Sequence, residues 1–195
     1  MTIDTATIQK LRAETGAGIM DVKKALVETD GNIDAALEHL RKQGQKIAAK
    51  KQDREASEGV VSAYVHANNK LVAVVALACE TDFVAKTEDF QTLAHDLAMH
   101  VAAADPLYLK SEDIPAAVIE KEKEVYRAQL EQEGKPEKMW DQIITGKLKK
   151  YYSEVCLLDQ LFIKDDSMTV AALVTSYIAK LGENIQIKKF YRQTL

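Results

Sequence analysis

Apolar residues at helical spacing divide the first forty residues into three segments. They are Ile8 and Leu11, then Val22, Ala25 and Leu26, then Ile33, Ala36, Leu37 and Leu40. The last group has the i, i+3, i+4, i+7 spacing of one helix face, and glycine-containing breaks end the first two groups. This pattern predicts a bundle of three short helices over residues 1–41. So small a bundle has a thin core and is marginally stable by itself.

Basic residues dominate the next segment, residues 42–56. Lys42, Lys46, Lys50 and Lys51 lie there, with almost no large apolar side chains. We predict a solvated linker, and partial helix is compatible with that role. Contact with nucleic acid is the weaker alternative, because no aromatic residues alternate with the basic ones to stack on bases.

The remaining residues, 57–195, predict a second domain that contains a small sheet. Gly59–His66 alternates loosely and Leu71–Cys79 is an apolar run of strand length. Asn68-Asn69 between them tolerates the left-handed conformation of a tight turn, so the two segments predict a β-hairpin. Residues 184–190 alternate again and predict the last strand.

Helical patterns accompany these strands. One apolar stripe is suited to covering a face of the hairpin, and it consists of Phe90, Leu93, Ala94, Leu97, Ala98 and Val101. Two later helices are separated by Gly134 and Pro136 and should lie antiparallel; Ser111 or Asp113 should cap the first, with Pro115 in its first turn.

An apolar connection over Leu157–Ile163 and a helix over Val170–Leu181 complete the prediction. The predicted fold class is α+β. It combines the three-helix bundle with a core of three antiparallel strands, which are backed by helices and a helical hairpin.

The stretch from Glu80 to Val84 is the strongest candidate contact, because an acid and an aromatic, Asp82 and Phe83, directly follow the apolar run. A loop that begins where a rigid strand ends is held in place, so its tip can enter a partner. The alternative is structural: Asp82 caps a helix and Phe83 turns into the protein's own core.

The composition does not favour general binding to nucleic acid, since the formal net charge of the chain is −4. The two cysteines, Cys79 and Cys156, have apolar neighbours and suggest buried thiols in a reducing compartment. The first residues are polar and unlike a signal peptide, and no apolar run reaches membrane-spanning length. We therefore expect a cytoplasmic protein.

The sequence offers no credible catalytic constellation. His95 and His100 are five residues apart and do not share the i, i+4 face of a helical metal pair. Gly16-Ala17-Gly18 follows a helix instead of a strand, so it does not predict a dinucleotide site. We expect a binding protein that is not an enzyme and that has no cofactor and no metal site.

Two motifs resemble the elongation factor Ts family. The first is Thr-Gly-Ala-Gly-Ile-Met-Asp at residues 15–21, followed by Lys-Lys-Ala-Leu, and the second is Thr-Asp-Phe-Val at residues 81–84. The resemblance extends from Ile8 almost to the carboxy terminus and includes Leu-Ala-Met-His-Val-Ala-Ala at residues 97–103. The three-helix form of residues 1–41 is also similar to ubiquitin-associated domains.

The resemblance implies a guanine-nucleotide exchange factor that binds elongation factor Tu and promotes release of GDP. It assigns magnesium displacement to Thr81, Asp82, Phe83 and Val84, with Phe83 as a wedge between partner helices. It also makes Ile19, Met20 and Lys23 secondary partner contacts; on the residues alone, Ile19 and Met20 could equally cap the three-helix core.

The chain has room for one of the two core halves found in the long form of the family. Short forms resemble it and pair as homodimers, so the resemblance implies a homodimer. The alternative function is a non-catalytic, dimeric interaction adaptor that uses the ubiquitin-associated-like module.

Overall fold

The structure is a computed structural model that describes residues 3–195. Three helices form the amino-terminal bundle: α1 (Thr5–Thr15), α2 (Ile19–Glu28) and α3 (Ile33–Lys51). Side chains cap two of them, because Asp4 accepts a hydrogen bond from the Ala6 amide and Asn32 accepts one from the Ala35 amide. The predicted apolar positions form one buried cluster with two exceptions: Leu37 packs at its margin, and Ile33, the first residue of α3, is exposed.

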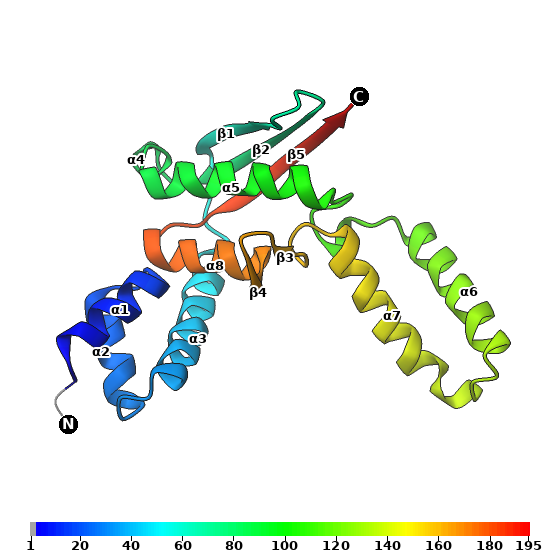
Figure 1. Cartoon of the computed structure of the whole chain (residues 1–195), viewed down its shortest axis with the longest axis horizontal. Coiled ribbons are helices and arrows are strands. Elements are labelled where there is room, and N and C mark those ends of the chain that lie inside the picture. Colours follow the sequence, from blue (N-terminus) through cyan, green and yellow to red (C-terminus); the bar gives the residue numbers. More distant parts are fainter. Residues whose placement is uncertain (1–2) are drawn as a thin grey trace.

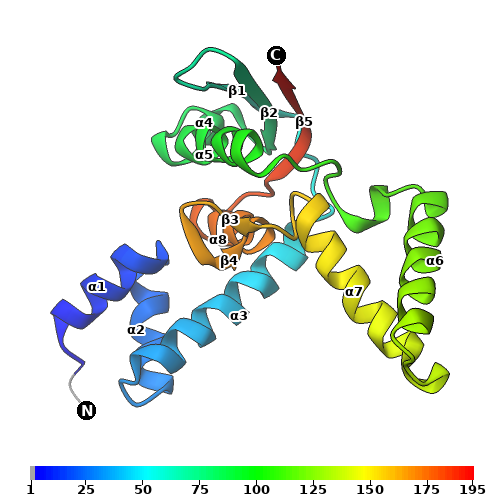
Figure 2. The same ribbon diagram turned by 45° about the vertical axis from the view of Figure 1, so that its right-hand side comes forward.

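Helix α3 is longer than the sequence analysis predicted. It continues to Lys51, so irregular chain in the expected linker is confined to residues after that helix. Its second half packs against α8 (Val170–Leu181), where Gly44 lies beside Ala179 and Ala48 contacts the main core. Figures 1 and 2 both show α3 running up to α8. Lys42, Lys46 and Lys50 are exposed on this docked helix, and Lys51 at its end donates a hydrogen bond to the Gly182 carbonyl.

The three predicted antiparallel strands are present. Strand β2 (Leu71–Cys79) lies between β1 (Glu58–Val65) and β5 (Gln186–Thr194). Asn69 adopts a positive φ of 55° in the turn between β1 and β2, as the hairpin prediction requires. Strand β5 extends beyond the predicted segment, and a register shift lies opposite Ala76 and Leu77.

One face of this sheet carries the main core. Helix α5 (Glu88–Ala104) covers that face, and α8 lies on the far side of α5 (Figure 1). Phe90, Leu93 and Leu97 of α5 are fully buried in the same cluster as Val75 and Leu77 of β2. The predicted apolar stripe therefore covers the hairpin as expected.

The opposite face of the sheet has no helix over it in the described chain (Figure 1). Its side chains are mostly apolar. Val61 and Val65 of β1 are exposed, Val72 and Val74 of β2 are half-buried, and Tyr191 of β5 is exposed. Val74 is paired with Tyr191 in the sheet, so the apolar surface crosses from the central strand to the edge.

Helices α6 (Ala116–Gln132) and α7 (Trp140–Val155) form the predicted helical hairpin, which projects from the core in Figure 1. A small cluster around Leu130, Ile144 and Leu148 holds the pair together. The predicted side-chain cap is wrong. Pro115 occupies the cap position of α6, and Ser111–Asp113 forms a separate 3-10 turn, η1.

Two short features were not predicted. The expected apolar connection contains strand β3 (Leu161–Phe162), which pairs with β4 (Asp165–Thr169), and a 3-10 turn, η2 (Glu137–Met139), precedes α7. The hairpin of β3 and β4 leads into α8, which then ends at Gly182 in a left-handed conformation with φ 75°. This ending sends the chain toward the turn that follows β2.

Candidate functional site

The candidate contact stretch forms a turn and a single helical turn directly after the central strand. Strand β2 ends at Cys79, and helix α4 (Asp82–Ala85) begins three residues later, after Glu80 and Thr81. Thr81 has extended backbone angles and its side-chain oxygen accepts a hydrogen bond from the Val84 amide, at 3.4 Å. Thr81 is therefore the amino-terminal cap of α4, and the alternative that gave this role to Asp82 is wrong.

Helix α4 is anchored on one side only. Ala85 is buried in the main core and Val84 is half-buried against it. Phe83 points away, with 79% of its surface exposed, a larger fraction than any other aromatic side chain of the described chain shows. The alternative that turned Phe83 into the protein's own core is therefore wrong, and an aromatic tip projects into solvent.

Asp82 lies beside this tip and is paired with Lys86, the residue directly after α4. Its Oδ2 accepts a hydrogen bond from Lys86 Nζ at 2.6 Å, four residues later along the chain. This bond from Lys86 lowers the pKa of the Asp82 carboxyl from its ordinary value, and the same bond raises the pKa of Lys86. Asp82 therefore remains ionised at neutral pH. A partner group that pairs with it must compete with Lys86.

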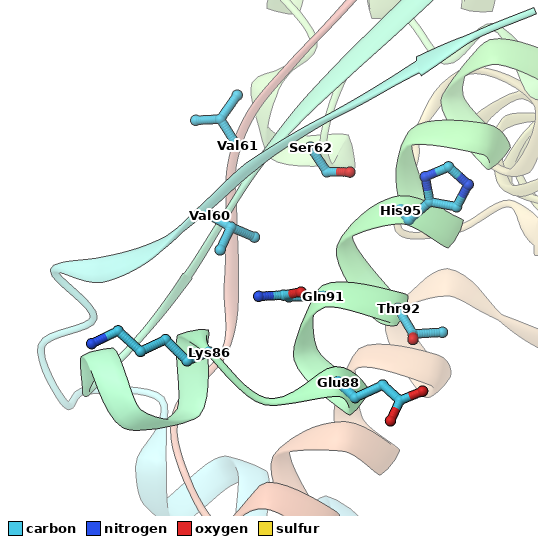
Figure 3. Close-up of a pocket in the computed structure, with 8 residues that line it drawn as sticks. All are labelled: Val60, Val61, Ser62, Lys86, Glu88, Gln91, Thr92 and His95. Carbon is cyan, nitrogen blue, oxygen red and sulfur yellow. The ribbon is translucent and has the colours of Figure 1, made fainter.

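A groove of about 670 Å³ adjoins α4 and runs between the edge strand β1 and helix α5 (Figure 3). Its lining is mixed, and consists of Val60, Val61, Ser62, Lys86, Glu88, Gln91, Thr92 and His95. Figure 3 shows the Gln91 side chain directed into the gap beneath Val60. Lys86, which lines the groove, is also the residue that pairs with Asp82 next to Phe83.

The secondary candidates lie in the amino-terminal bundle. Helix α2 begins at Ile19, immediately after Gly18, and no side chain caps it. Ile19 is 50% exposed and Met20 is 71% exposed, Lys23 is also exposed, and none of the three belongs to the buried cluster of the bundle. The structure therefore presents two apolar side chains and one cation at the start of α2.

Lys180 of α8 connects the bundle to the region of the tip. Its aliphatic stem passes so close to Gly16 that a Cβ there would lie 2.9 Å from Lys180 Cδ. Its Nζ donates to Asp89 Oδ1 at 2.7 Å, in the first turn of α5. In Figure 1, α4 and the bundle lie at the same end of the molecule. The two sets of candidates are thus supported by the same helix, α8.

One residue that the sequence analysis did not include reaches the site. Glu183, just after α8, accepts hydrogen bonds from the Glu80 and Thr81 amides and from the Thr81 hydroxyl. The contacts join residues more than one hundred positions apart. No local sequence pattern indicates a pairing of that kind.

The ionisable groups elsewhere show no arrangement for bond-making chemistry. Burial raises the pKa of Cys79, and it raises the pKa of Cys156 to about 11, so both thiols stay protonated at neutral pH. Across residues 3–195, no three His, Cys, Asp or Glu side chains are grouped to hold a metal ion. Nor does any helix in that range have the length and apolarity needed to cross a membrane.

Together, the fold and this site define an α+β protein with an exposed aromatic side chain on a short helix just after its central strand. The chain matches a family model described as Elongation factor TS over residues 3–177. It is 49% identical to elongation factor Ts of Syntrophus aciditrophicus (strain SB) over all 195 residues, which cover 97% of that protein. It is 53% identical to elongation factor Ts of Maridesulfovibrio salexigens over its full length, covering 95% of that relative.

A third relative, elongation factor Ts of Herpetosiphon aurantiacus, is 50% identical over 98% of this chain and 97% of its own length. The chain belongs to the elongation factor Ts family. Its role therefore lies in the elongation stage of protein biosynthesis.

Proposed function

We propose that this protein binds elongation factor Tu in its GDP-bound and nucleotide-free forms and promotes the release of GDP, so that GTP can bind. It acts in the cytoplasm as an exchange factor and catalyses no chemical step. The observation that carries the proposal is Phe83, an exposed aromatic side chain on a helical turn anchored at the end of the central strand. Such a side chain can fill an apolar pocket of a partner without rearrangement of its own core.

The exchange follows from thermodynamic linkage. A partner-binding protein that prefers the nucleotide-free state must lose affinity when GDP is present, and GDP affinity falls by the same factor. Magnesium contributes to the hold on the diphosphate. Insertion of Thr81–Val84 near that metal would disturb its coordination, with Phe83 as the wedge and Asp82 keeping the insertion in register.

The amino-terminal bundle supplies the second contact. Ile19, Met20 and Lys23 would touch the nucleotide domain of elongation factor Tu. Their exposure at the start of α2 supports this role, since a side chain that completed the bundle's own core would be buried.

The free protein is proposed to be a homodimer that pairs through the open face of the sheet. Val61 is 73% exposed there, and it adjoins further apolar side chains of β1 and β2. A contiguous apolar sheet face is a surface that association stabilises. Light scattering should give twice the chain mass of 21.7 kDa at micromolar concentration. Val61→Asp should shift the protein to a monomer, and a monomeric wild type would disprove the pairing.

The direct test of the exchange function is release of fluorescent GDP from elongation factor Tu, with and without this protein. Wild type should accelerate release. Phe83→Ala should lower the exchange efficiency on the order of 30-fold, because loss of an interface anchor typically costs about 2 kcal/mol or more. Leu107→Ala is a matched control, because Leu107 is also exposed but lies beyond the other end of α5.

Each outcome of this assay has a distinct meaning. Stimulation by wild type, with loss in Phe83→Ala alone, supports the wedge. Equal stimulation by wild type and Phe83→Ala contradicts it. Failure of wild type to accelerate release contradicts the exchange function as a whole and favours the adaptor alternative.

A further inference from the structure

The turn between β2 and α4 is held by a carboxylate from a distant part of the chain. Glu183 Oε2 accepts hydrogen bonds from the amides of Glu80 and Thr81, each at 3.0 Å. Its second oxygen, Oε1, accepts the Thr81 hydroxyl at 2.6 Å. One side chain thus satisfies two consecutive backbone donors and the hydroxyl of the residue that caps α4.

The position of Glu183 is itself fixed. Helix α8 ends at Gly182, whose left-handed conformation turns the chain so that Glu183 faces the turn. The next residue, Asn184, is buried; its amide donates to Glu80 Oε1 at 2.6 Å. The Asn184 side chain donates to the Arg54 carbonyl at 2.7 Å and to the Gln52 carbonyl at 3.3 Å. Hydrogen bonds therefore run from the turn after β2 to Glu183 and from Asn184 back to Glu80 in that turn.

Helix α4 depends on this support because it is only four residues long. A single helical turn has almost no stability of its own, so its direction is set by the groups that fix its first residue. Thr81 is that residue. Its amide and hydroxyl bind Glu183, and its carbonyl accepts the Ala85 amide at 3.2 Å and the Cys79 thiol at 3.1 Å. Phe83 lies two residues further along the same turn.

We propose that Glu183 is a positioning residue for the exchange function: it holds the turn after β2 so that Phe83 is already in its binding orientation before the partner arrives. The inference rests on the proposed function of Phe83. Its physical basis is preorganisation, because a loop that is ordered in advance does not pay that entropy on binding. Without the carboxylate, two amides and a hydroxyl would turn to water and α4 would lose its fixed start.

The test compares Glu183→Ala with Glu183→Gln. Alanine removes all three acceptor contacts. Glutamine can keep its carbonyl oxygen on the two amides and turn its NH2 toward Thr81 Oγ1, so it should rescue most of the function. Glu55→Ala is the control, because Glu55 is an exposed acid that follows Arg54, whose carbonyl binds the Asn184 side chain, and it makes no side-chain hydrogen bond among the described residues.

The first measurement needs no partner. Amide hydrogen exchange at Glu80 and Thr81 should accelerate about ten-fold or more in Glu183→Ala, as expected for loss of hydrogen bonds to a charged acceptor. It should change little in Glu183→Gln and in Glu55→Ala. Unchanged protection in Glu183→Ala would overturn the proposal, whatever the partner does.

The second measurement is GDP release from elongation factor Tu. Glu183→Ala should lower the exchange efficiency about ten-fold or more, and its effect should largely vanish in a background that already carries Phe83→Ala. Full additivity of the two changes, or wild-type release by Glu183→Ala, would refute positioning through Phe83. If wild type itself gives no acceleration, the exchange function fails, and the hydrogen-exchange result still decides whether Glu183 holds the turn.

Discussion

Among the glycines, Gly59 is the one at which an added methyl group would meet the shortest contacts. It is the second paired residue of β1, opposite Ala78, with a φ of 149° that side-chain-bearing residues rarely adopt. A Cβ built there would lie 2.1 Å from the Leu77 carbonyl oxygen and 2.8 Å from Ala78 Cα. Both atoms belong to the backbone of the central strand, so neither can move aside as a flexible side chain would.

We therefore expect Gly59→Ala to destabilise the protein by roughly 2–5 kcal/mol, from overpacking together with backbone strain. For a chain of this size, that should lower the melting temperature by roughly 4–20 °C. The start of β1 would have to shift from β2 close to Cys79, where the turn to α4 begins. GDP release should therefore also slow.

The assay is thermal unfolding followed by circular dichroism, with Gly146→Ala as the matched control. Gly146 lies inside helix α7 and a Cβ there meets nothing within 4 Å. The control should be neutral or stabilising by up to about 1 kcal/mol. If Gly59→Ala has the same melting temperature as the control, the added Cβ does not clash with the backbone of β2, and the reasoning is refuted.

Three further changes test other parts of the molecule. Asp82→Asn should slow GDP release and leave the melting temperature nearly unchanged, because the ion pair of Asp82 with Lys86 is exposed. If the variant releases GDP at the wild-type rate at both low and high magnesium, Asp82 does not contact the partner. Deletion of residues 1–54 should weaken elongation factor Tu binding and leave a cooperatively melting core of lower melting temperature; full affinity would exclude Ile19, Met20 and Lys23. The free energy of unfolding of the wild type should fall between pH 7 and pH 5, and it should fall less in His100→Gln. Equal pH profiles of the two proteins would contradict a role of His100 in this loss of stability.

The pH prediction follows from the environment of His100. Its side chain is fully buried, with Nε2 3.0 Å from Gln160 Oε1, and its Nδ1 accepts the Ile163 amide at 3.3 Å. Burial lowers the pKa of His100 from its ordinary value. The unfolded chain therefore binds a proton at a higher pH than the folded protein does. Stability is complete above the unfolded pKa and is lost as the pH falls through it toward the folded pKa.

The sequence predicted the elements whose apolar pattern is strong and local. The apolar run of β2, the alternation of β1 and the stripe of α5 all have the predicted structure, because each packs one regular face on the core; the inward side chains of β1 are half-buried. Strand β4 was missed because its residues, Asp165–Thr169, are mostly polar and carry no alternation of apolar side chains. Its antiparallel pairing with β3 is made by backbone groups, which the pattern of side chains does not reveal.

Contacts between distant segments were the second limit. The length of α3 follows from its packing on α8, which a basic composition does not reveal. The sequence also left the direction of Phe83 open, since an aromatic after a strand can face either way. Burial of Ala85 decides it, because the side of α4 that faces the core is occupied by that residue. No sequence pattern indicated Glu183, because the two amides and the hydroxyl that it binds belong to Glu80 and Thr81, more than one hundred positions earlier in the chain.

The end of α8 is a common support for both candidate contacts. Lys180 packs its stem on Gly16 beside the bundle, and Glu183, three residues later, holds the turn before Phe83. Lys51 at the end of α3 donates to the carbonyl of Gly182, between the two. The last residues of α8 therefore contact both the bundle next to the start of α2 and the turn before Phe83. This packing, and not a flexible linker, sets the distance between the two candidate contacts. A partner that binds both contacts must match that spacing, so binding energy gained at the bundle can be applied to seating Phe83.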